Sequence, residues 1–351
     1  MSSAQTGQPG VSPDGRGLGL SLLVIATAQL MLVLDDTIAN IALPSIQREL
    51  SVAASTLPWV INAYILAFGL LLFGGRVGGL FGRRHVFRAG LGLFALASLL
   101  GGLGMNAEML IGARALQGVG AALTAPNALA LIATNFPVGK PHNSAMVIYG
   151  AMSALGITVG VLLRGVLTGT LGWRWVFFIN IPIGLAVLVG SGVLAEGERN
   201  GGSLDAPGAL TGTGARVTLT YGITHAAEHG WGNTVTLGAV GAAVVLGLLF
   251  LRLQTRGTDP ILPLGLFRDR NRSGSYATML FVGAGLMGTF YLLALYLQQV
   301  LGFSPLWAGI VSLPLSAGII LGAGISSKLV ERLAPRLVAG PGLLLGALGM
   351  L

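Results

Sequence analysis

The stretch "LVLDDTIANIALP", residues 32–44, places two adjacent carboxylates, Asp35 and Asp36, inside a segment that is otherwise apolar. The apolar run around them begins near Leu18 and is long enough to cross a membrane, which takes roughly 20 residues. A charged side chain at the bilayer centre costs about 2.5–3.5 kcal/mol on insertion scales. The two aspartates therefore predict a partner charge or a water-filled cavity within a membrane protein.

The composition of the whole chain agrees with this interpretation. Hydrophobic residues make up 53% and charged residues 9%, and the mean hydropathy is +0.80. Soluble domains carry about 25% charged residues, so this chain cannot cover a water-facing surface. Its net charge of +8 lies mainly in short gaps between apolar runs, which indicates membrane topology rather than a nucleic-acid partner. Cysteine is absent, which excludes disulfides and thiolate metal sites. We therefore expect an all-α integral membrane protein.

The hydropathy pattern predicts ten full membrane spans, at residues 18–43, 57–80, 86–105, 108–133, 144–169, 174–195, 207–226, 232–251, 274–298 and 305–327. An eleventh begins near Arg336 and reaches the last residue in mid-helix. The Gly-, Ser- and Pro-rich residues 1–17 are expected to form a disordered cytoplasmic tail. The apolar run after them is longer than a signal-peptide core, so we interpret it as a retained span.

The basic residues predict the orientation of the chain. With the N-terminus in the cytoplasm, 14 of the 20 basic residues fall in cytoplasmic gaps, and the outer gaps hold only Arg48 and Arg174. This bias follows the positive-inside rule, so we expect a multi-pass protein of the plasma membrane with a cytoplasmic N-terminus. The polar breaks predict five segments after the tail: a six-helix bundle, a cytoplasmic linker, two additional spans, a second linker and a partial C-terminal bundle, at 18–195, 196–206, 207–252, 253–273 and 274–351.

Two stretches resemble motifs of the 14-spanning drug:proton antiporter family of the major facilitator superfamily. The stretch "LDDTIANIALP" resembles that family's first-helix signature through Asp35, Thr37, Asn40, Ala42, Leu43 and Pro44. The stretch "RALQGVGAA", residues 114–122, resembles its fourth-helix motif Arg-x-x-x-Gly-x-Gly in full.

Two further stretches resemble the family with departures. "GGRVGGLFGRRHVF", residues 74–87, resembles the gating loop between helices two and three through Gly75, Gly82, Arg83 and Arg84. The family's aspartate falls on Gly79, which cannot make the charge contacts thought to brace the two half-bundles. "GITVGVLLRG", residues 156–165, resembles the fifth-helix antiporter motif through Gly156, Gly160 and Gly165, with Val161 in its proline slot and Arg164 in one glycine slot.

The resemblance implies a major facilitator fold with a complete N-terminal six-helix bundle, two linker helices and an incomplete C-terminal bundle. It implies proton-coupled efflux of amphiphilic small molecules by alternating access, in a monomer that needs no cofactor beyond the proton gradient. Because the chain stops about three spans short of the family's complement, the resemblance also implies a piece of a longer transporter. The alternatives are a non-transporting truncated membrane protein, an uncoupled facilitator, or a sensor or intramembrane enzyme. We find no clustered nucleophile or metal set that indicates an enzyme.

Asp35 and Arg114 are predicted to meet at one depth in the membrane. They lie about eight and six residues from the outer ends of their spans, or roughly 12 Å and 9 Å at helical rise. Our hypothesis is that Asp35 takes up the proton and that Arg114, which stays charged, tunes its protonation. Asp36 points about 100° away and would cap or hydrate the site. The alternative is a purely structural ion pair. Asn40, Asn62, Tyr64 and Gln117 are further cavity candidates, although such residues are as often helix-contact groups.

Other polar features do not fit this hypothesis. Arg216 lies near the middle of the predicted seventh span with no carboxylate at an obvious depth, and the sequence offers no physical account of it. "HAAEH", residues 225–229, has the spacing of an inverted zinc-protease motif but lacks a third ligand, so we predict no metal site. A Walker motif is absent, which argues against an ATP-driven pump. Tyr291, Tyr296, Gln298 and Gln299 are expected to form an interfacial belt rather than a substrate contact.

Overall fold

The computed structural model describes residues 15–53, 56–166, 171–197, 199, 205–257, 260–303, 305–330 and 332–349. Helices form almost all of these ranges, and no strand occurs within them. The predicted tail, residues 1–17, lies outside the described residues except for its last three, which begin the first helix.

The helices follow one another along the whole described chain. Their bounds are α1 Gly15–Leu50, α2 Trp59–Phe68, α3 Leu71–Phe81, α4 Arg83–Gly102, α5 Ala107–Asn135, α6 Lys140–Val166, α7 Trp175–Phe178, α8 Asn180–Gly190, α9 Ala206–His229, α10 Thr234–Arg256, α11 Arg270–Leu295, α12 Pro305–Val330 and α13 Pro335–Leu348. Short 3₁₀ turns lie at Ser191–Val193 and Leu264–Arg268, and a π turn lies at Tyr296–Val300.

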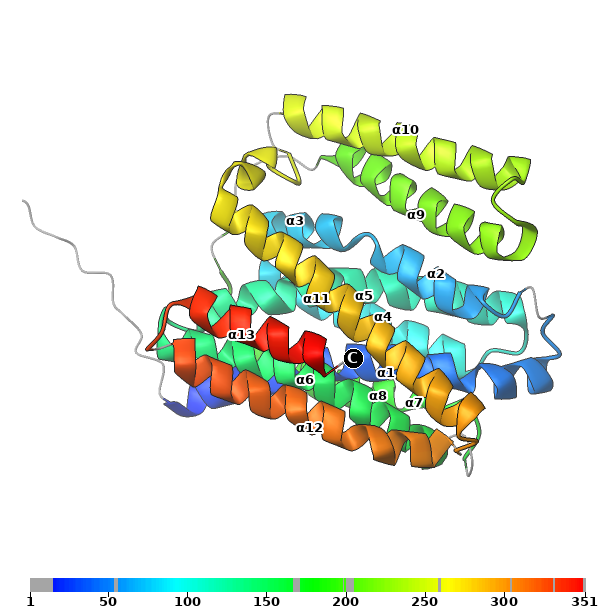
Figure 1. The fold of residues 1–351 in the computed structure, drawn as a ribbon, viewed down its shortest axis with the longest axis horizontal. Helices are drawn as coiled ribbons and strands as arrows, with labels where there is room; N and C mark the ends of the chain where they lie inside the picture. The colour runs from blue at the N-terminus through cyan, green and yellow to red at the C-terminus, as the bar shows by residue number, and fades with distance from the viewer. Residues whose placement is uncertain are drawn as a thin grey trace, which may run out of the picture.

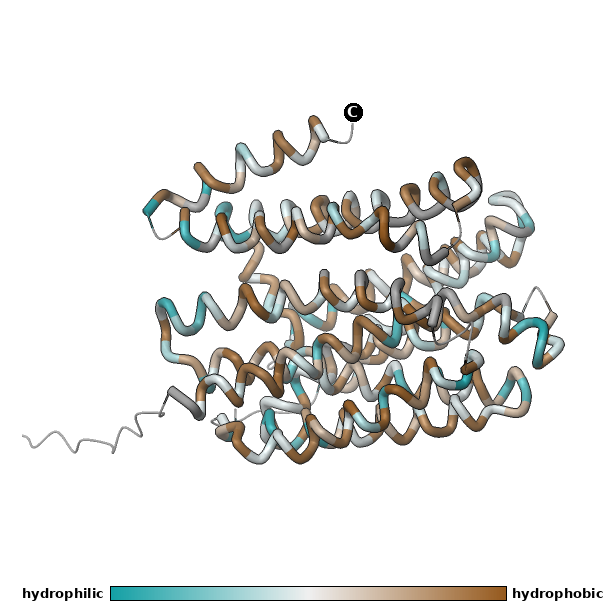
Figure 2. Tube along the Cα trace, turned by 90° about the horizontal axis from the view of Figure 1, so that it is seen from below, coloured by the Kyte–Doolittle hydropathy of each residue, from teal (hydrophilic) through white to brown (hydrophobic). Residues whose placement is uncertain are grey.

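In the part of the chain that the structure describes, each of the ten predicted spans is mainly helical. Within the described residues, six helices are long and apolar enough to cross a membrane, or seven if one bent pair counts as a single span. Helix α1 has 36 residues, or about 54 Å at helical rise, and so exceeds the roughly 30 Å hydrocarbon core. Brown, hydrophobic colour dominates along the helices in Figure 2. These features agree with the predicted membrane character.

The second predicted span, residues 57–80, is not one straight helix. It is divided into α2 and α3, which meet at an angle of 46°. The break falls at Gly69 and Leu70, where the low helix propensity of glycine weakens the helix. The predicted second span thus corresponds to a bent pair of helices that together are long and apolar enough to form one span. Hydropathy does not predict the bend, because it records how apolar a segment is and not the course of its backbone.

Polar side chains cap several helix starts. Asn106, Asp205, Asn233 and Asp269 each accept a hydrogen bond from a backbone N–H in the first turn of α5, α9, α10 and α11. Such a cap satisfies one of the donors that a helix start leaves without an intrahelical partner. The hydrogen bond that Asp269 accepts from the Arg272 backbone N–H also lowers the pKa of that carboxyl. These residues explain why the loops end where they do.

The first six predicted spans pack as one bundle, in which α1 contacts α5, α6 and α8, and α5 contacts α2, α3 and α4 (Figure 1). Two buried clusters form its core. One includes Ile25, Met31, Phe87, Phe94 and Leu131, and the other includes Ile38, Leu110, Trp173 and Phe177. Helices α9 and α10 form a hairpin beside α2 and α3, while α12 packs on α6.

Contacts between connections show which ends of the helices lie together. At one end, Glu49 in the last turn of α1 pairs with Arg174, whose guanidinium also donates to the Gly104 carbonyl at 3.1 Å. At the other end, Arg84 donates to the Leu194 carbonyl at 2.9 Å, and Asn135 accepts from the Ala195 N–H at 2.8 Å. The first six predicted spans therefore alternate in direction, as the predicted topology requires.

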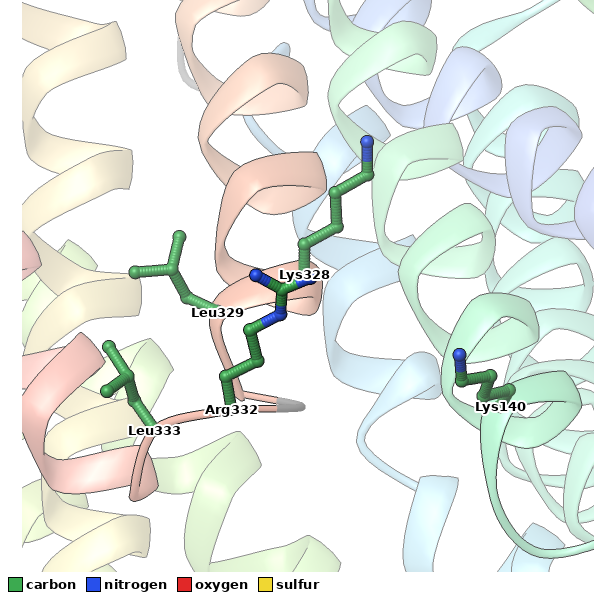
Figure 3. Close-up of a pocket in the computed structure, with 5 residues that line it drawn as sticks. All are labelled: Lys140, Lys328, Leu329, Arg332 and Leu333. Atoms are coloured by element: carbon green, nitrogen blue, oxygen red, sulfur yellow. The ribbon is translucent and has the colours of Figure 1, made fainter.

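A basic pocket of about 740 Å³ is lined by Lys140, Lys328, Leu329, Arg332 and Leu333, from the start of α6, the last turn of α12 and the residues that follow it (Figure 3). The topology prediction assigns its three basic residues to two different cytoplasmic gaps. The structure brings these two gaps to the same end of the molecule.

Candidate functional site

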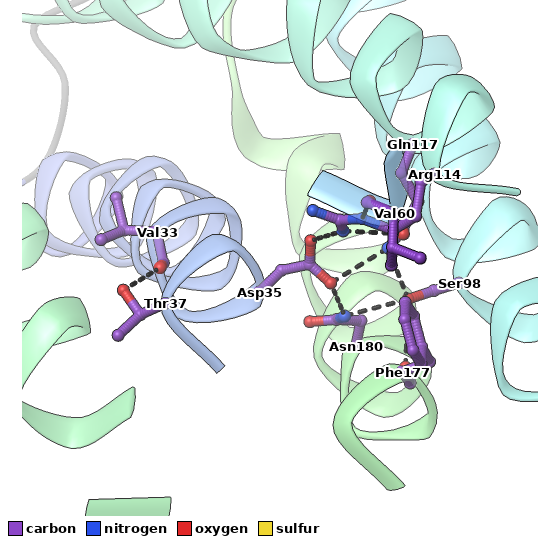
Figure 4. Close-up of polar contacts among 9 residues, drawn as sticks. All are labelled: Val33, Asp35, Thr37, Val60, Ser98, Arg114, Gln117, Phe177 and Asn180. Carbon is purple, nitrogen blue, oxygen red and sulfur yellow. Dashed lines mark hydrogen bonds and ion pairs between the residues drawn. The ribbon is translucent and has the colours of Figure 1, made fainter. Parts of the chain in front are cut away.

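Asp35 of α1 and Arg114 of α5 form an ion pair in the interior of the bundle. Arg114 Nη1 donates to Asp35 Oδ2 at 2.6 Å, and the side chains of both residues are 0% exposed (Figure 4). The two groups therefore lie at one depth, as the sequence predicted. A role in proton coupling stays a prediction.

Two amides and a hydroxyl complete a network around the Asp35 carboxylate (Figure 4). Gln117 Nε2 and Asn180 Nδ2 both donate to Asp35 Oδ1, at 3.0 Å and 2.7 Å. The same amides donate to Ser98 Oγ, each at 2.9 Å, and this hydroxyl donates to the Phe177 carbonyl. Four helices, α1, α4, α5 and α8, therefore supply one polar cluster in an apolar core.

Sequence reasoning missed Ser98 and Asn180, the members of this network on α4 and α8. Both are buried, and both lie in apolar stretches, "ALASLL" and "FINIPI". A polar side chain inside an apolar span is a signal for an interhelical hydrogen bond, because lipid offers it no partner. That signal identifies polar residues that need a partner in another helix, but it does not predict which residues pair with each other.

Arg114 is held by α2 as well as by Asp35. Its Nε donates to the Val60 carbonyl at 3.1 Å, and its Cζ lies 4.3 Å from the ring centroid of Tyr64. The motif glycine Gly118 makes this approach possible, because a Cβ there would come within 2.7 Å of Ala67 Cβ on α2. Tyr64, predicted as a cavity residue, is buried beneath the guanidinium, while Asn62 is half-buried on the same helix.

The network is sealed from solvent in this conformation. Asp35, Ser98, Arg114, Gln117 and Asn180 are each at most 1% exposed. This conformation therefore does not show the expected water-filled cavity around the pair. The reason is packing: the two amides and the Tyr64 ring occupy the volume around the charges.

Asp36 and Asn40 are the remaining first-helix candidates. Asp36 is half-buried on α1, and its position next to Asp35 turns it toward a different face of the helix. Asn40 falls within α1, but its side chain lies outside the described residues.

The predicted gating loop is almost entirely helical. Gly75, assigned to this motif by resemblance, lies inside α3 and within the predicted span 57–80, where a Cβ would stand 3.5 Å from Pro126 of α5. Gly82 alone makes the turn between α3 and α4, with a φ of +102° that side-chain-bearing residues rarely adopt. Arg83 and Arg84 form the first turn of α4.

Glu196 provides an acidic contact at this turn. Its Oε1 accepts from the Arg84 backbone N–H at 3.0 Å, and its Oε2 lies 2.6 Å from His85 Nδ1. Arg83 instead donates to Thr134 Oγ1 at the end of α5, at 3.2 Å. An acid from beyond α8 thus contacts the start of α4, whereas Gly79, at the position of the family's aspartate, lies inside α3.

The antiporter-motif glycines allow α6 to pack closely on α1. A Cβ at Gly156 would lie 2.9 Å from Val33 Cβ, and one at Gly160 would lie 2.9 Å from Thr37 Cβ. Both partners flank Asp35, so this crossing supports the helix that carries the carboxylate. Gly165 ends the motif within α6, and its surroundings lie outside the described residues, as do the side chains of Val161 and Arg164.

Replacing Gly160 by leucine is expected to destabilise the α1–α6 crossing by about 1–3 kcal/mol, because the side chain overpacks against Thr37. The apparent melting temperature of the purified protein in detergent measures this effect. Gly150→Leu is the matched control, since a Cβ at Gly150 on the same helix meets nothing within 4 Å. Equal melting temperatures for the two variants would contradict the packing role.

Arg216, which sequence analysis left unexplained, lies against the break in the second span. Its Nη1 donates to the Gly69 carbonyl at 3.4 Å, and Gly69 is the residue at which α2 ends. The predicted belt residue Tyr296 is 52% exposed, whereas the side chains of Tyr291, Gln298 and Gln299 lie outside the described residues.

The two histidines of "HAAEH", the stretch with the zinc-protease spacing, stack their imidazole rings on each other. The rings of His225 and His229 lie 4.1 Å apart, and His225 Nδ1 is 3.0 Å from Thr236 Oγ1. Within the described part of the chain, no group of three or more histidine, cysteine, aspartate or glutamate side chains is arranged to hold a metal ion.

Comparison with known proteins extends these observations. The sequence model of the Major Facilitator Superfamily matches residues 25–351. The chain is 44% identical over 333 residues to the puromycin resistance protein pur8 of Streptomyces alboniger, covering 94% of this chain and 66% of that protein. It is 36% identical over 336 residues to the cephamycin export protein CmcT of Amycolatopsis lactamdurans, covering 94% of this chain and 69% of the relative.

The fold has a solved counterpart in the proton:xylose symporter XylE, with a TM-score of 0.58 at 14% identity, over 90% of this chain and 70% of that one. At this identity the likeness concerns the fold alone. The family match, by contrast, spans nearly the whole chain and agrees with its apolar helices. The chain is a multi-pass membrane protein that belongs to the Major Facilitator Superfamily, a family of transporters rather than enzymes.

Proposed function

We propose that this protein exports amphiphilic small molecules, including antibiotics, by proton-coupled antiport. The observation that carries the proposal is the buried Asp35–Arg114 pair, since an ionisable pair in a membrane interior is a functional candidate by default. Relatives named for puromycin resistance and cephamycin export support an antibiotic as the cargo. No cofactor is needed, because the proton gradient supplies the energy.

The geometry of the pair suggests how proton uptake is coupled to movement. A proton arriving at Asp35 Oδ2 competes with the Arg114 Nη1 donor for the same oxygen, which lies 2.6 Å away. Proton uptake therefore requires the pair to open, and α1 and α5 must shift relative to each other. In alternating access, this shift opens the sealed network to the cavity where substrate binds. The released guanidinium keeps its hydrogen bond to the Val60 carbonyl and its contact with Tyr64.

We also propose the 14-spanning antiporter type, in the plasma membrane, with a cytoplasmic N-terminus and a monomeric state. The hairpin of α9 and α10 supports this type, because it lies beside the first bundle as a separate pair of helices (Figure 1). The excess of basic residues in the predicted cytoplasmic gaps supports the orientation.

The test is accumulation of ethidium and puromycin in cells that express the chain. Expressing cells are expected to accumulate less of both compounds than cells with an empty vector, and a protonophore is expected to remove the difference. A second arm uses the chain completed to fourteen spans, which tests the alternative of a non-transporting membrane protein. Activity only in the completed version would favour that alternative for this chain. A difference that persists with the protonophore would favour an uncoupled facilitator.

A further inference from the structure

A second pocket lies away from the Asp35 network, between α3 and the hairpin of α9 and α10. We call it the Arg216 pocket; its volume is about 230 Å³, and its lining includes Phe73, Ala209, Gly212, Arg216, Phe250 and Ile261. Apart from Arg216 and the hydroxyl of Thr213, which also lines the pocket, the lining side chains are apolar. Gly212 brings α9 close to the Phe250 ring, since a Cβ there would come within 3.0 Å of it. The pocket is therefore a mainly apolar site with one guanidinium and one hydroxyl.

That guanidinium lies deep in the predicted membrane. Arg216 is ten residues into α9, or about 15 Å from the start of the helix, which corresponds to mid-bilayer. A charge at this depth costs about 2.5–3.5 kcal/mol unless a partner compensates it.

The contacts of Arg216 leave most of its donors available. A guanidinium has five N–H donors, and within the described part of the chain Arg216 makes one hydrogen bond, to the Gly69 carbonyl at 3.4 Å. The ion pairs described for this part of the chain join other residues. The electrostatics of the pocket therefore favour an anion that comes from outside the described chain.

We propose that the Arg216 pocket binds a small carboxylate-bearing amphiphile, with its carboxylate on Arg216 and its apolar part between Phe73 and Phe250. A planar guanidinium matches a carboxylate through two parallel hydrogen bonds. One carboxylate neutralises the single positive charge, whereas a phosphate monoester would bring about −1.5 to −2. The volume lies below the roughly 300–1,000 Å³ of sites for drug-sized ligands, which selects a single short chain or ring.

Binding there would connect the hairpin to the broken second span. Arg216 contacts Gly69, which lies in the break between α2 and α3, and Gly69 and Phe73 both line the pocket. A bound carboxylate would thus link α9 to the bend between α2 and α3. This site lies apart from Asp35, so the inference does not depend on the proposed transport function.

The experiment measures the thermal unfolding of the purified full chain in a non-ionic detergent, titrated with decanoate or with decanol. Decanoate is expected to raise the melting temperature of the wild type saturably. In Arg216→Gln the apparent affinity for decanoate is expected to fall about tenfold or more. Arg252→Gln is the matched control, because it removes an exposed arginine from α10 and leaves the pocket intact. Decanol, which has the same chain without the charge, is expected to give no saturable rise.

A second variant keeps the inference falsifiable if Arg216→Gln does not fold. Ala209→Phe fills the pocket and keeps the charge, so it is expected to lose the decanoate response. The proposal is overturned if decanoate has no effect on the wild type, or if decanol acts equally well. It is also overturned if Arg216→Gln and Ala209→Phe respond like the wild type, which would mean that decanoate acts through the micelle or another site.

Discussion

Replacing Asp35 by asparagine is expected to abolish proton-driven efflux. Cells that express the variant are then expected to accumulate as much drug as cells without the protein. Asparagine keeps the shape of the side chain but cannot exchange a proton. Its amide still has partners, because Gln117 and Asn180 can present either their oxygen or their nitrogen to it. The measurement is uptake of ethidium by inside-out vesicles under an imposed proton gradient, normalised to the amount of folded protein.

The control for this prediction is Glu108→Gln, which removes an exposed carboxylate from the same helix as Arg114. Its uptake is expected to match the wild type. Downhill equilibration of ethidium without a gradient separates loss of coupling from loss of the transport path. If folded Asp35→Asn protein still drives uptake with the gradient, the assignment of Asp35 as the proton carrier fails, and the pair is structural.

Replacing Arg114 by methionine is expected to lower the stability of the first bundle by about 3–5 kcal/mol, because it leaves the Asp35 charge buried without its partner. Methionine approximates the length of the arginine stem, so little volume is lost. The variant also loses the hydrogen bond to Val60 and the contact with Tyr64. The measurement is the free energy of unfolding in mixed micelles with increasing denaturing detergent.

The double variant Asp35→Asn with Arg114→Met tests whether this loss comes from the unpaired charge. Removing both charges is expected to recover most of the lost stability, since replacing a whole buried pair is often close to neutral. The Gln117 and Asn180 amides keep their hydrogen bonds to Ser98 in this variant. Additive losses in the two single variants and the double variant would show that the charges do not interact energetically.

The sequence alone determined the features that depend on local composition. Apolar runs of sufficient length predicted the helices, because a membrane span must satisfy its backbone groups internally. The depths of Asp35 and Arg114 followed from counting residues along two helices, which is why their meeting was predictable. The family resemblance rested on short motifs whose residues are all local.

The tertiary structure decided which side chains meet across helices and where helices bend. Asn180 reaches Asp35 only because α8 packs against α1, and Ser98 joins the network only because α4 packs against α5 and α8. No local pattern encodes these contacts. The contact between Gly69 and Arg216 depends on α9, because Arg216 lies 147 residues later in the chain than Gly69. Hydropathy is a property of each segment, whereas burial, pairing and bending depend on what the neighbouring segments supply.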